Sequence, residues 1–337
     1  MEQNMIEEIL PDLYRIEIPL PNSPLKSVNS YLLISDRRNL AIDTGFNQPT
    51  CLETLRQAYH ELDVDLTRTD FLSTHLHVDH HGLVGKLAEP DAKKYMGKTD
   101  AQLLEKHLDW QKILHITAIS GFSVEKLQFL RKNHPMQKLA PDFSIRWDYV
   151  QEGDSLSIGN YTVTCLETPG HTWGHICLWD TERKILFSGD HILGDITSNI
   201  QVWDFDDDPL ASYMTNLDRI SGLEIQLVLP GHRSIIRNCG SRIEALKRHH
   251  MDRCNEVLDI LETSAQNAEQ TAAQMTWDIK AESWDKIPVL QQWFATGEAV
   301  AHLRFLANKG LVAQEIQKDG VILYSITAEA KRLKSMD

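Results

Sequence analysis

The feature that most constrains the fold of this chain is a polar stretch at residues 74–82, which reads THLHVDHHG. A surface loop is the simplest interpretation, but imidazole and carboxylate are the usual nitrogen and oxygen ligands of divalent metals. The stretch therefore predicts a metal site that needs further ligands from elsewhere in the chain. Its candidate ligands are His75, His77, Asp79 and His80, with His81 beside them.

Alternating β-rich segments and turns precede this stretch. The sequence predicts strands at 13–20, 28–35 and 39–45, a helix at 48–60 and a strand at 68–75. The last strand delivers the histidines into a loop at its carboxyl end, where a rigid scaffold can hold polar groups around a ligand. The metal site is therefore expected on the rim of a sheet.

Three later fragments each place one polar side chain at the end of an expected strand. His171 and His232 follow a Pro-Gly pair, which ends a strand and turns the backbone. Asp190 follows an apolar strand and a Ser-Gly turn. A single structural zinc site needs only four ligands, whereas this set suffices for two metal ions if one carboxylate bridges them. The set is His75, His77, Asp79, His80, His171, Asp190 and His232.

These residues resemble the metallo-β-lactamase superfamily, whose signature H-x-H-x-D-H is matched from His75 to His80. The resemblance covers about residues 8–262 and implies an α/β fold, an αββα sandwich, with a helical insertion at about 98–140. It also implies a ligand assignment. His75, His77 and His171 would hold a first metal ion and Asp79, His80 and His232 a second, with Asp190 between them.

The resemblance implies supporting positions as well. Asp43 resembles a buried aspartate that braces the metal-binding loop. His81 and His175 lie beside ligands and are expected to support or pack, while His191 is expected to face away. The other histidines are expected on helix surfaces or in packing: His60, His107, His115, His134, His249, His250 and His302.

The expected domains are a catalytic domain at 1–262 and a linker with a C-terminal winged-helix domain at 263–337. In the insertion, a helix is predicted across residues 103–114, either as ordinary packing or as a lid. In the tail, two helices at 287–295 and 297–310 precede two strands joined at Asp319-Gly320. The tail and the segment after Asp190 resemble the lactamase-beta-2-like subgroup, whose members are described as hydrolases, in some cases endoribonucleases.

The charge balance bears on the partners. With 34 basic and 48 acidic residues the formal net charge is -14, which argues against nonspecific binding to nucleic acid or anionic membranes. Residues 271–337 hold eight residues of each sign, so a structural or dimerising role of the tail, for example in a homodimer, is favoured over DNA binding. No membrane span or export signal is visible, and five scattered cysteines fit reduced thiols, so a cytoplasmic protein is expected.

The expected function is hydrolysis of a small ester or thioester with two divalent metal ions, zinc first, with Mn and Fe also compatible. A metal-bridging hydroxide would attack, and Asp79 would carry the proton. A cysteine ligand is absent because Asp190 holds that position, and Leu193 stands where lactonases often have tyrosine. Two alternatives remain: an endoribonuclease or phosphodiesterase of the same fold, and a metal-dependent regulatory or binding protein that uses its tail.

Overall fold

The computed structural model describes residues 5–106, 109–134, 138–139, 144–204 and 206–330. Backbone contacts divide the chain into two compact units. The first comprises residues 1–108, 138–198 and 218–243, and the second comprises 109–137, 199–217 and 244–337. Compact units do not show where a chain divides into independently folding domains, so the boundary expected at residue 262 stays a prediction.

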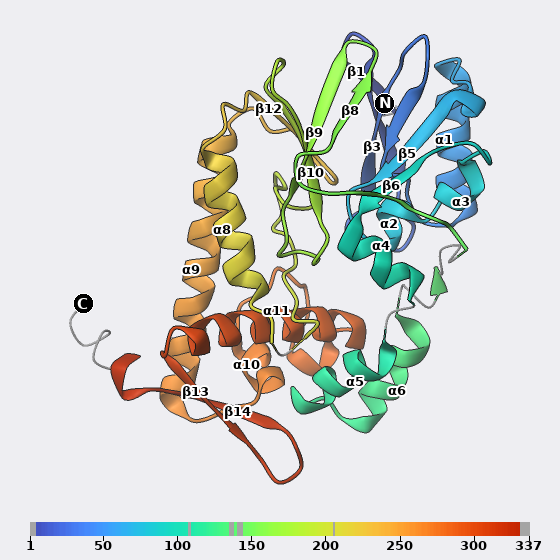
Figure 1. The fold of residues 1–337 in the computed structure, drawn as a ribbon. Coiled ribbons are helices and arrows are strands. Elements are labelled where there is room, and N and C mark those ends of the chain that lie inside the picture. The colour runs from blue at the N-terminus through green and yellow to red at the C-terminus, as the bar shows by residue number, and fades with distance from the viewer. Residues whose placement is uncertain (1–4, 107–108, 135–137, 140–143, 205, 331–337) are drawn as a thin grey trace. The chain divides into compact units, whose positions relative to one another are not determined.

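The first unit contains a seven-stranded sheet in the order β1-β2-β3-β4-β5-β6-β7 (Figure 1). Strands β1 to β4 pair antiparallel, and β4 to β7 pair parallel. The strands expected at 13–20, 28–35, 39–45 and 68–75 are all present. The bounds are β1 (Ile6–Leu10), β2 (Leu13–Pro19), β3 (Ser27–Leu33), β4 (Asn39–Ile42), β5 (Thr69–Ser73), β6 (Lys94–Gly97) and β7 (Asp148–Val150).

The second sheet of this unit has five strands in the order β12-β11-β10-β9-β8. All neighbours are antiparallel except β11 and β12, which run parallel. Strands β9, β11 and β12 therefore point the same way, and their carboxyl ends lie at one edge. The bounds are β8 (Ser155–Ile158), β9 (Tyr161–Glu167), β10 (Ile176–Asp180), β11 (Ile185–Gly189) and β12 (Leu227–Pro230).

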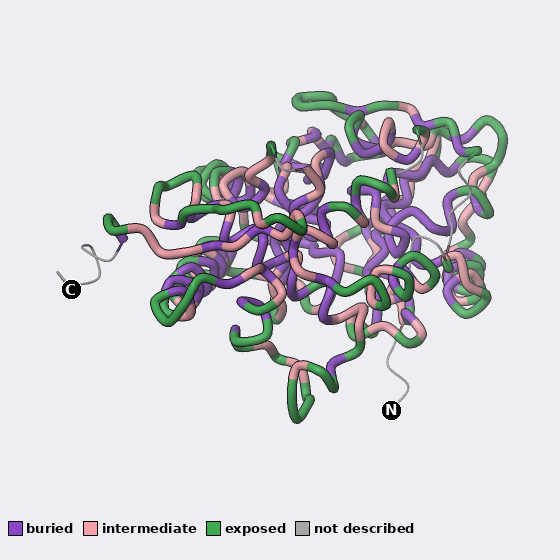
Figure 2. Tube along the Cα trace, turned by 90° about the horizontal axis from the view of Figure 1, so that it is seen from below, coloured by how far each residue is buried: buried purple, intermediate pink, exposed green. Residues whose placement is uncertain are grey.

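Apolar side chains of the two sheets form one core, so the sheets face each other as a sandwich. The ring of Tyr31 meets that of Phe187 edge-on, with centroids 5.5 Å apart. Figure 2 marks the buried stretches, which include every residue of β3, β5, β10 and β11. The expected helix at 48–60 is α1 (Pro49–Glu61), which packs on β2. Three shorter helices follow: α2 (Val78–His81), α3 (Val84–Leu87) and α4 (Lys98–Glu105).

The second unit is mainly helical. It contains α5 and α6 of the insertion, α10, α11 and the hairpin β13–β14, with most of α8 and α9. No helix among the described residues is long and apolar enough to cross a membrane. The bounds are α5 (Trp110–Ile119), α6 (Val124–Asn133), α8 (Pro209–Ser221), α9 (Cys239–Thr263), α10 (Ala268–Gln274), α11 (Val289–Asn308), β13 (Val312–Ile316) and β14 (Ile322–Ile326).

The helix expected across residues 103–114 is two helices. Helix α4 ends at Glu105, and α5 begins at Trp110. The cause is Asp109, whose side chain accepts hydrogen bonds from two backbone N–H groups of the first turn of α5 and so caps that helix. His107 lies outside the described residues. The insertion therefore does not form one continuous helix.

The tail also differs from the expectation in two places. The polar segment expected as a linker forms α10, which begins with a reciprocal capping box between Asn267 and Gln270. The two helices expected at 287–295 and 297–310 are the single helix α11. Gly297 does not break this helix: a Cβ there would lie 2.9 Å from the side chain of Gln201. This glycine therefore permits a close approach.

The expected hairpin is confirmed. Strands β13 and β14 pair antiparallel, and Gly320 in the connecting turn has a φ of 89°, a left-handed conformation that favours glycine. The order of the tail elements, helices α10 and α11 and then the hairpin, is compatible with a winged-helix domain, and that assignment stays a prediction.

The core predicts a large stability effect at Phe187. Its side chain is 1% exposed, so we expect Phe187→Ala to lower the free energy of unfolding by about 3–5 kcal/mol. The matched control is Phe129→Ala at a position 44% exposed, with an expected change within about 0.5 kcal/mol. Urea unfolding followed by circular dichroism measures both, and similar losses in the two variants would contradict this packing.

Candidate metal centre

The predicted ligands follow strand ends of both sheets in the first unit. His75 and His77 lie in the loop after β5, and Asp79 and His80 lie on the short helix α2. The second sheet contributes one residue after each of the three strands whose carboxyl ends lie at one edge: His171 after β9, Asp190 after β11 and His232 after β12. The seven side chains, far apart in sequence, are brought together there.

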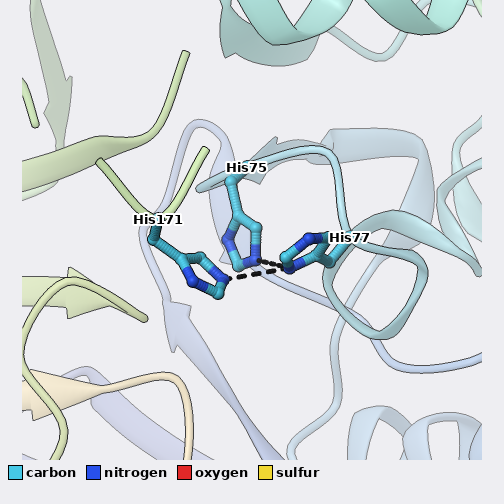
Figure 3. Close-up of side chains that lie close together, drawn as sticks. All are labelled: His75, His77 and His171. Atoms are coloured by element: carbon cyan, nitrogen blue, oxygen red, sulfur yellow. Dashed lines mark hydrogen bonds between the residues drawn. The ribbon is translucent and has the colours of Figure 1, made fainter. Parts of the chain in front are cut away.

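The three histidines assigned to the first metal ion converge on one point (Figure 3). Nδ1 of His77 lies 3.0 Å from Nε2 of His75 and 3.0 Å from Nε2 of His171. A lone pair on each of these nitrogens can face a common cation. The geometry therefore matches a three-imidazole ligand set.

The second set lies beside the first. Nε2 of His232 is 3.4 Å from a carboxylate oxygen of Asp79, and Nε2 of His80 is 3.9 Å from the same oxygen. Asp190 reaches both sets: one oxygen lies 3.6 Å from Nε2 of His80, and the other lies 3.6 Å from His171 and 3.5 Å from His232. The Asp190 carboxylate thus lies within 3.6 Å of histidine nitrogens of both sets.

Outer hydrogen bonds orient three of these imidazoles. Nδ1 of His80 lies 2.8 Å from the Asp43 carboxylate, and Nδ1 of His232 lies 2.6 Å from the Ser27 carbonyl oxygen. Nδ1 of His75 lies 3.0 Å from the Thr74 hydroxyl. When each Nδ1–H donates to its partner, Nε2 is left with its lone pair facing the centre.

Asp43 has the contacts expected of a brace. Besides its bond to His80, its carboxylate accepts the backbone N–H of Thr74 at 2.8 Å and the Thr74 hydroxyl at 2.9 Å. Its φ of 61° is left-handed, which is uncommon for a residue with a side chain. This strained aspartate therefore fixes both the start of the ligand loop and an imidazole on α2.

These residues fit a metal centre on two counts. Nε2 of His80, Nε2 of His232 and Oδ1 of Asp190 are buried, and none has a hydrogen-bond partner among the described residues. Neighbouring ligand atoms in the two sets lie 3.0 to 3.9 Å apart. Four ligands held tetrahedrally about 2.1 Å from zinc would lie about 3.4 Å from one another. The donor set therefore suits such an ion.

Charge balance makes this burial tolerable. Burial lowers the pKa of His75 and of His77, to about 3 for His77, so both are neutral. At Asp190 burial raises the pKa, but His232 and His80 lower it by more, and the net pKa is well below its usual value. At His80 burial lowers the pKa, but Asp43 and Asp190 raise it well above normal. A metal ion would therefore have to displace protons from this second set.

The neighbouring histidines lie outside the three groups that could hold an ion. Nε2 of His81 is 2.9 Å from the Leu76 carbonyl oxygen. Nε2 of His175 accepts the Asp190 N–H at 3.1 Å, so this side chain supports the backbone of the bridging candidate. His191 is fully buried, and its ring lies near that of His175, with centroids 6.1 Å apart and ring planes tilted by 42°.

The remaining histidines belong to none of these groups either, among the residues that the structure describes. His60 and His115 are exposed. His250 and His302 are buried in the second unit, where Nδ1 of His250 lies 3.2 Å from Nε2 of His302. This pairing between α9 and α11 is a packing contact.

One residue beside the ligand loops, Asp100, was not predicted from the sequence. It is fully buried and accepts hydrogen bonds from Leu76, Thr172 and Gly174. In the sequence it is an acidic residue in the first turn of a helix, a common position that suggests only favourable interaction with the helix dipole. No local pattern distinguished it.

Comparison with known families agrees with this geometry. The family described as the metallo-beta-lactamase superfamily matches residues 24–232, and the metallo-beta-lactamase-like C-terminal domain matches residues 254–327. The first match covers more than half of the chain, so the chain belongs to the metallo-beta-lactamase superfamily. Its fold is that of metal-dependent hydrolases, whose divalent metal is typically zinc.

Individual relatives extend the likeness over nearly the whole chain. A beta-lactamase-like protein 2 homolog from Caenorhabditis elegans is 26% identical over 302 residues, 88% of this chain and 81% of that protein. A beta-lactamase domain protein from Burkholderia ambifaria has a TM-score of 0.82 at 27% identity, covering 96% of this chain and 94% of its own. The predicted family and α/β sandwich are thus confirmed.

A fungal relative has a more specific name. The atrochrysone carboxyl ACP thioesterase of Aspergillus fumigatus is 24% identical over 249 residues, 73% of this chain. The matched region is 48% of that protein, so this chain spans about half of its length.

The charges of the centre predict how the stability of metal-stripped protein depends on pH. Burial lowers the pKa of His232, but Asp190 and Asp79 raise it by more, to about 10. The pKa of His232 in the unfolded chain is about 6.5. Protonation of His232 therefore stabilises the fold fully below about pH 6.5, and this stabilisation is lost as the pH rises toward about 10. We expect the free energy of unfolding to fall more between about pH 7 and about pH 10 in the wild type than in His232→Gln.

Urea titrations across this pH range measure the difference. The control is His115→Gln, a substitution at an exposed histidine, which should keep the wild-type slope. Equal slopes for the wild type and His232→Gln would contradict the assigned charges.

Proposed function

We propose that this chain is a hydrolase that uses two divalent metal ions, most simply zinc. The observation that supports the proposal best is the position of Asp190, whose two oxygens face His80 on one side and His171 and His232 on the other. His75, His77 and His171 would hold the first ion, and Asp79, His80 and His232 the second. When bound, such a pair supplies Lewis acidity and a water acidic enough to give hydroxide near neutral pH.

The chain's own residues would hold the reacting groups and move the proton. Burial raises the pKa of Asp79, but His80 and His232 lower it by more, so its carboxylate is ionised. We assign the proton transfer to this carboxylate. Asp43 and Ser27 keep His80 and His232 oriented through their outer nitrogens. The chain needs no serine or cysteine nucleophile in this scheme.

The proposed substrate is a small ester or thioester. The name of the fungal thioesterase supports acyl chemistry for a chain of this family. The net charge of -14 does not attract a polyanion such as RNA over long range.

The metal content tests the binuclear centre. We expect purified wild-type protein to hold close to two transition-metal ions per chain, and Asp190→Ala at most one, because that variant lacks the carboxylate shared by both sets. The control His60→Ala changes an exposed histidine and should keep two ions. Elemental analysis measures each. Trace metal in the wild type, with no activity restored by Zn, Mn or Fe, would refute the proposal.

The substrate class is tested with one metal-loaded preparation at near-physiological salt. We expect the highest kcat/KM for a small ester or thioester, and a loss of at least about 100-fold in Asp79→Ala, because that variant lacks the proposed proton carrier. Single-stranded RNA should be cut at background rate. Efficient RNA cleavage with background acyl hydrolysis would favour the endoribonuclease, and metal-loaded protein inert toward all of these would favour a regulatory or binding role.

A further inference from the structure

We propose that Asp100 is a positioning residue that joins the two ligand loops of the first metal set. One loop follows β5 and holds His75 and His77, and the other follows β9 and holds His171. The inference rests on the proposed metal-binding function, and it adds a residue outside the ligand set on which assembly of that set depends.

The carboxylate of Asp100 bonds both loops at once. One oxygen accepts the Leu76 N–H at 2.9 Å, between the two histidines of the first loop, and the Thr172 hydroxyl at 2.6 Å, next to His171. The other oxygen accepts the Gly174 N–H at 2.6 Å. All three partners can donate, so an ionised carboxylate satisfies each of them.

The backbone around Asp100 is closely packed. A Cβ at Gly97 would lie 2.1 Å from the Gly174 carbonyl oxygen, and a Cβ at Gly174 would lie 2.3 Å from the Asp100 nitrogen. Two glycines therefore let the start of α4 press directly against the second ligand loop. Asp100, in the first turn of α4, is placed where its side chain reaches both loops.

The hydrogen bonds of Asp100 matter because the two ligand loops follow strands of different sheets. One backbone hydrogen bond joins the ends of the loops: the Ile176 N–H, just after the second loop, donates to the Thr74 carbonyl oxygen, just before His75, at 2.9 Å. Asp43 bonds Thr74 and His80 but neither of the residues beside His171. Asp100 adds the connection at the ligand-bearing turns themselves, so its loss should let His171 move relative to His75 and His77.

The main test variant is Asp100→Asn. The amide has the same shape but replaces one oxygen by an NH₂ group, which would face a backbone N–H donor of Leu76 or Gly174. Thr172→Val is a second, milder variant that removes one of the three bonds. The control is Asp180→Asn: Asp180 is 1% exposed and accepts two hydrogen bonds from Arg183, away from both ligand loops.

Two measurements on the full chain separate the roles. Metal-stripped protein is titrated with Co²⁺ and followed by visible absorption, because a set with three imidazoles and a set with two imidazoles and a carboxylate of its own give different spectra. We expect the affinity of the first set to fall about 10–100-fold in Asp100→Asn, less in Thr172→Val and not at all in Asp180→Asn. In the metal-stripped protein, amide hydrogen exchange at Leu76 and Gly174 should be faster than in the wild type in Asp100→Asn. It should be unchanged in Asp180→Asn.

The outcomes distinguish this inference from the proposed function. Wild-type protein that binds two Co²⁺ ions, with wild-type affinity and exchange in Asp100→Asn, would overturn the positioning role. Equal losses in Asp100→Asn and Asp180→Asn would also overturn it, because general destabilisation would then suffice. Wild-type protein that binds no Co²⁺ would refute the metal function, while hydrogen exchange would still show whether Asp100 joins the loops. If Asp100→Asn does not fold, unchanged affinity in Thr172→Val would count against the inference.

Discussion

Gathering five imidazoles and two carboxylates in one buried place is the constraint on which the rest of this structure depends. Unpaired buried charges are costly, and this group is tolerable because each carboxylate has histidine nitrogens within 3.9 Å. The outer nitrogens of His80 and His232 must then be bonded elsewhere, to Asp43 and Ser27. The close turn at Gly231 follows from the same crowding, since a Cβ there would lie 2.5 Å from Asp190.

The candidate ligands were accessible from the sequence because each follows a strand and a local turn signal. The parallel pairing of β11 with β12, which brings Asp190 near His232, depends on segments about forty residues apart and has no local signature. Asp100 was missed for a related reason. Its neighbours in sequence describe an ordinary helix start, and its three hydrogen-bond partners belong to loops that only the folded chain brings near.

The helical parts were predicted less accurately, because their ends depend on single side chains and on distant contacts. Asp109 caps α5 and divides a run whose apolar spacing suggested one helix. Two helices were predicted at 287–295 and 297–310, but in the folded chain Gly297 leaves space for Gln201 inside a continuous helix. The capping box of Asn267 and Gln270 turns a segment poor in core residues into a helix. Composition alone could not separate these cases.

The cysteines of this chain have a practical consequence. All five are free and buried, and burial raises the pKa of Cys165, Cys177 and Cys254 to about 12. The thiolate is the reactive form of cysteine, so these thiols should be almost unreactive toward alkylating dyes in the native state. A single cysteine introduced at an exposed site could therefore receive a fluorophore or spin label selectively, without first removing the native thiols.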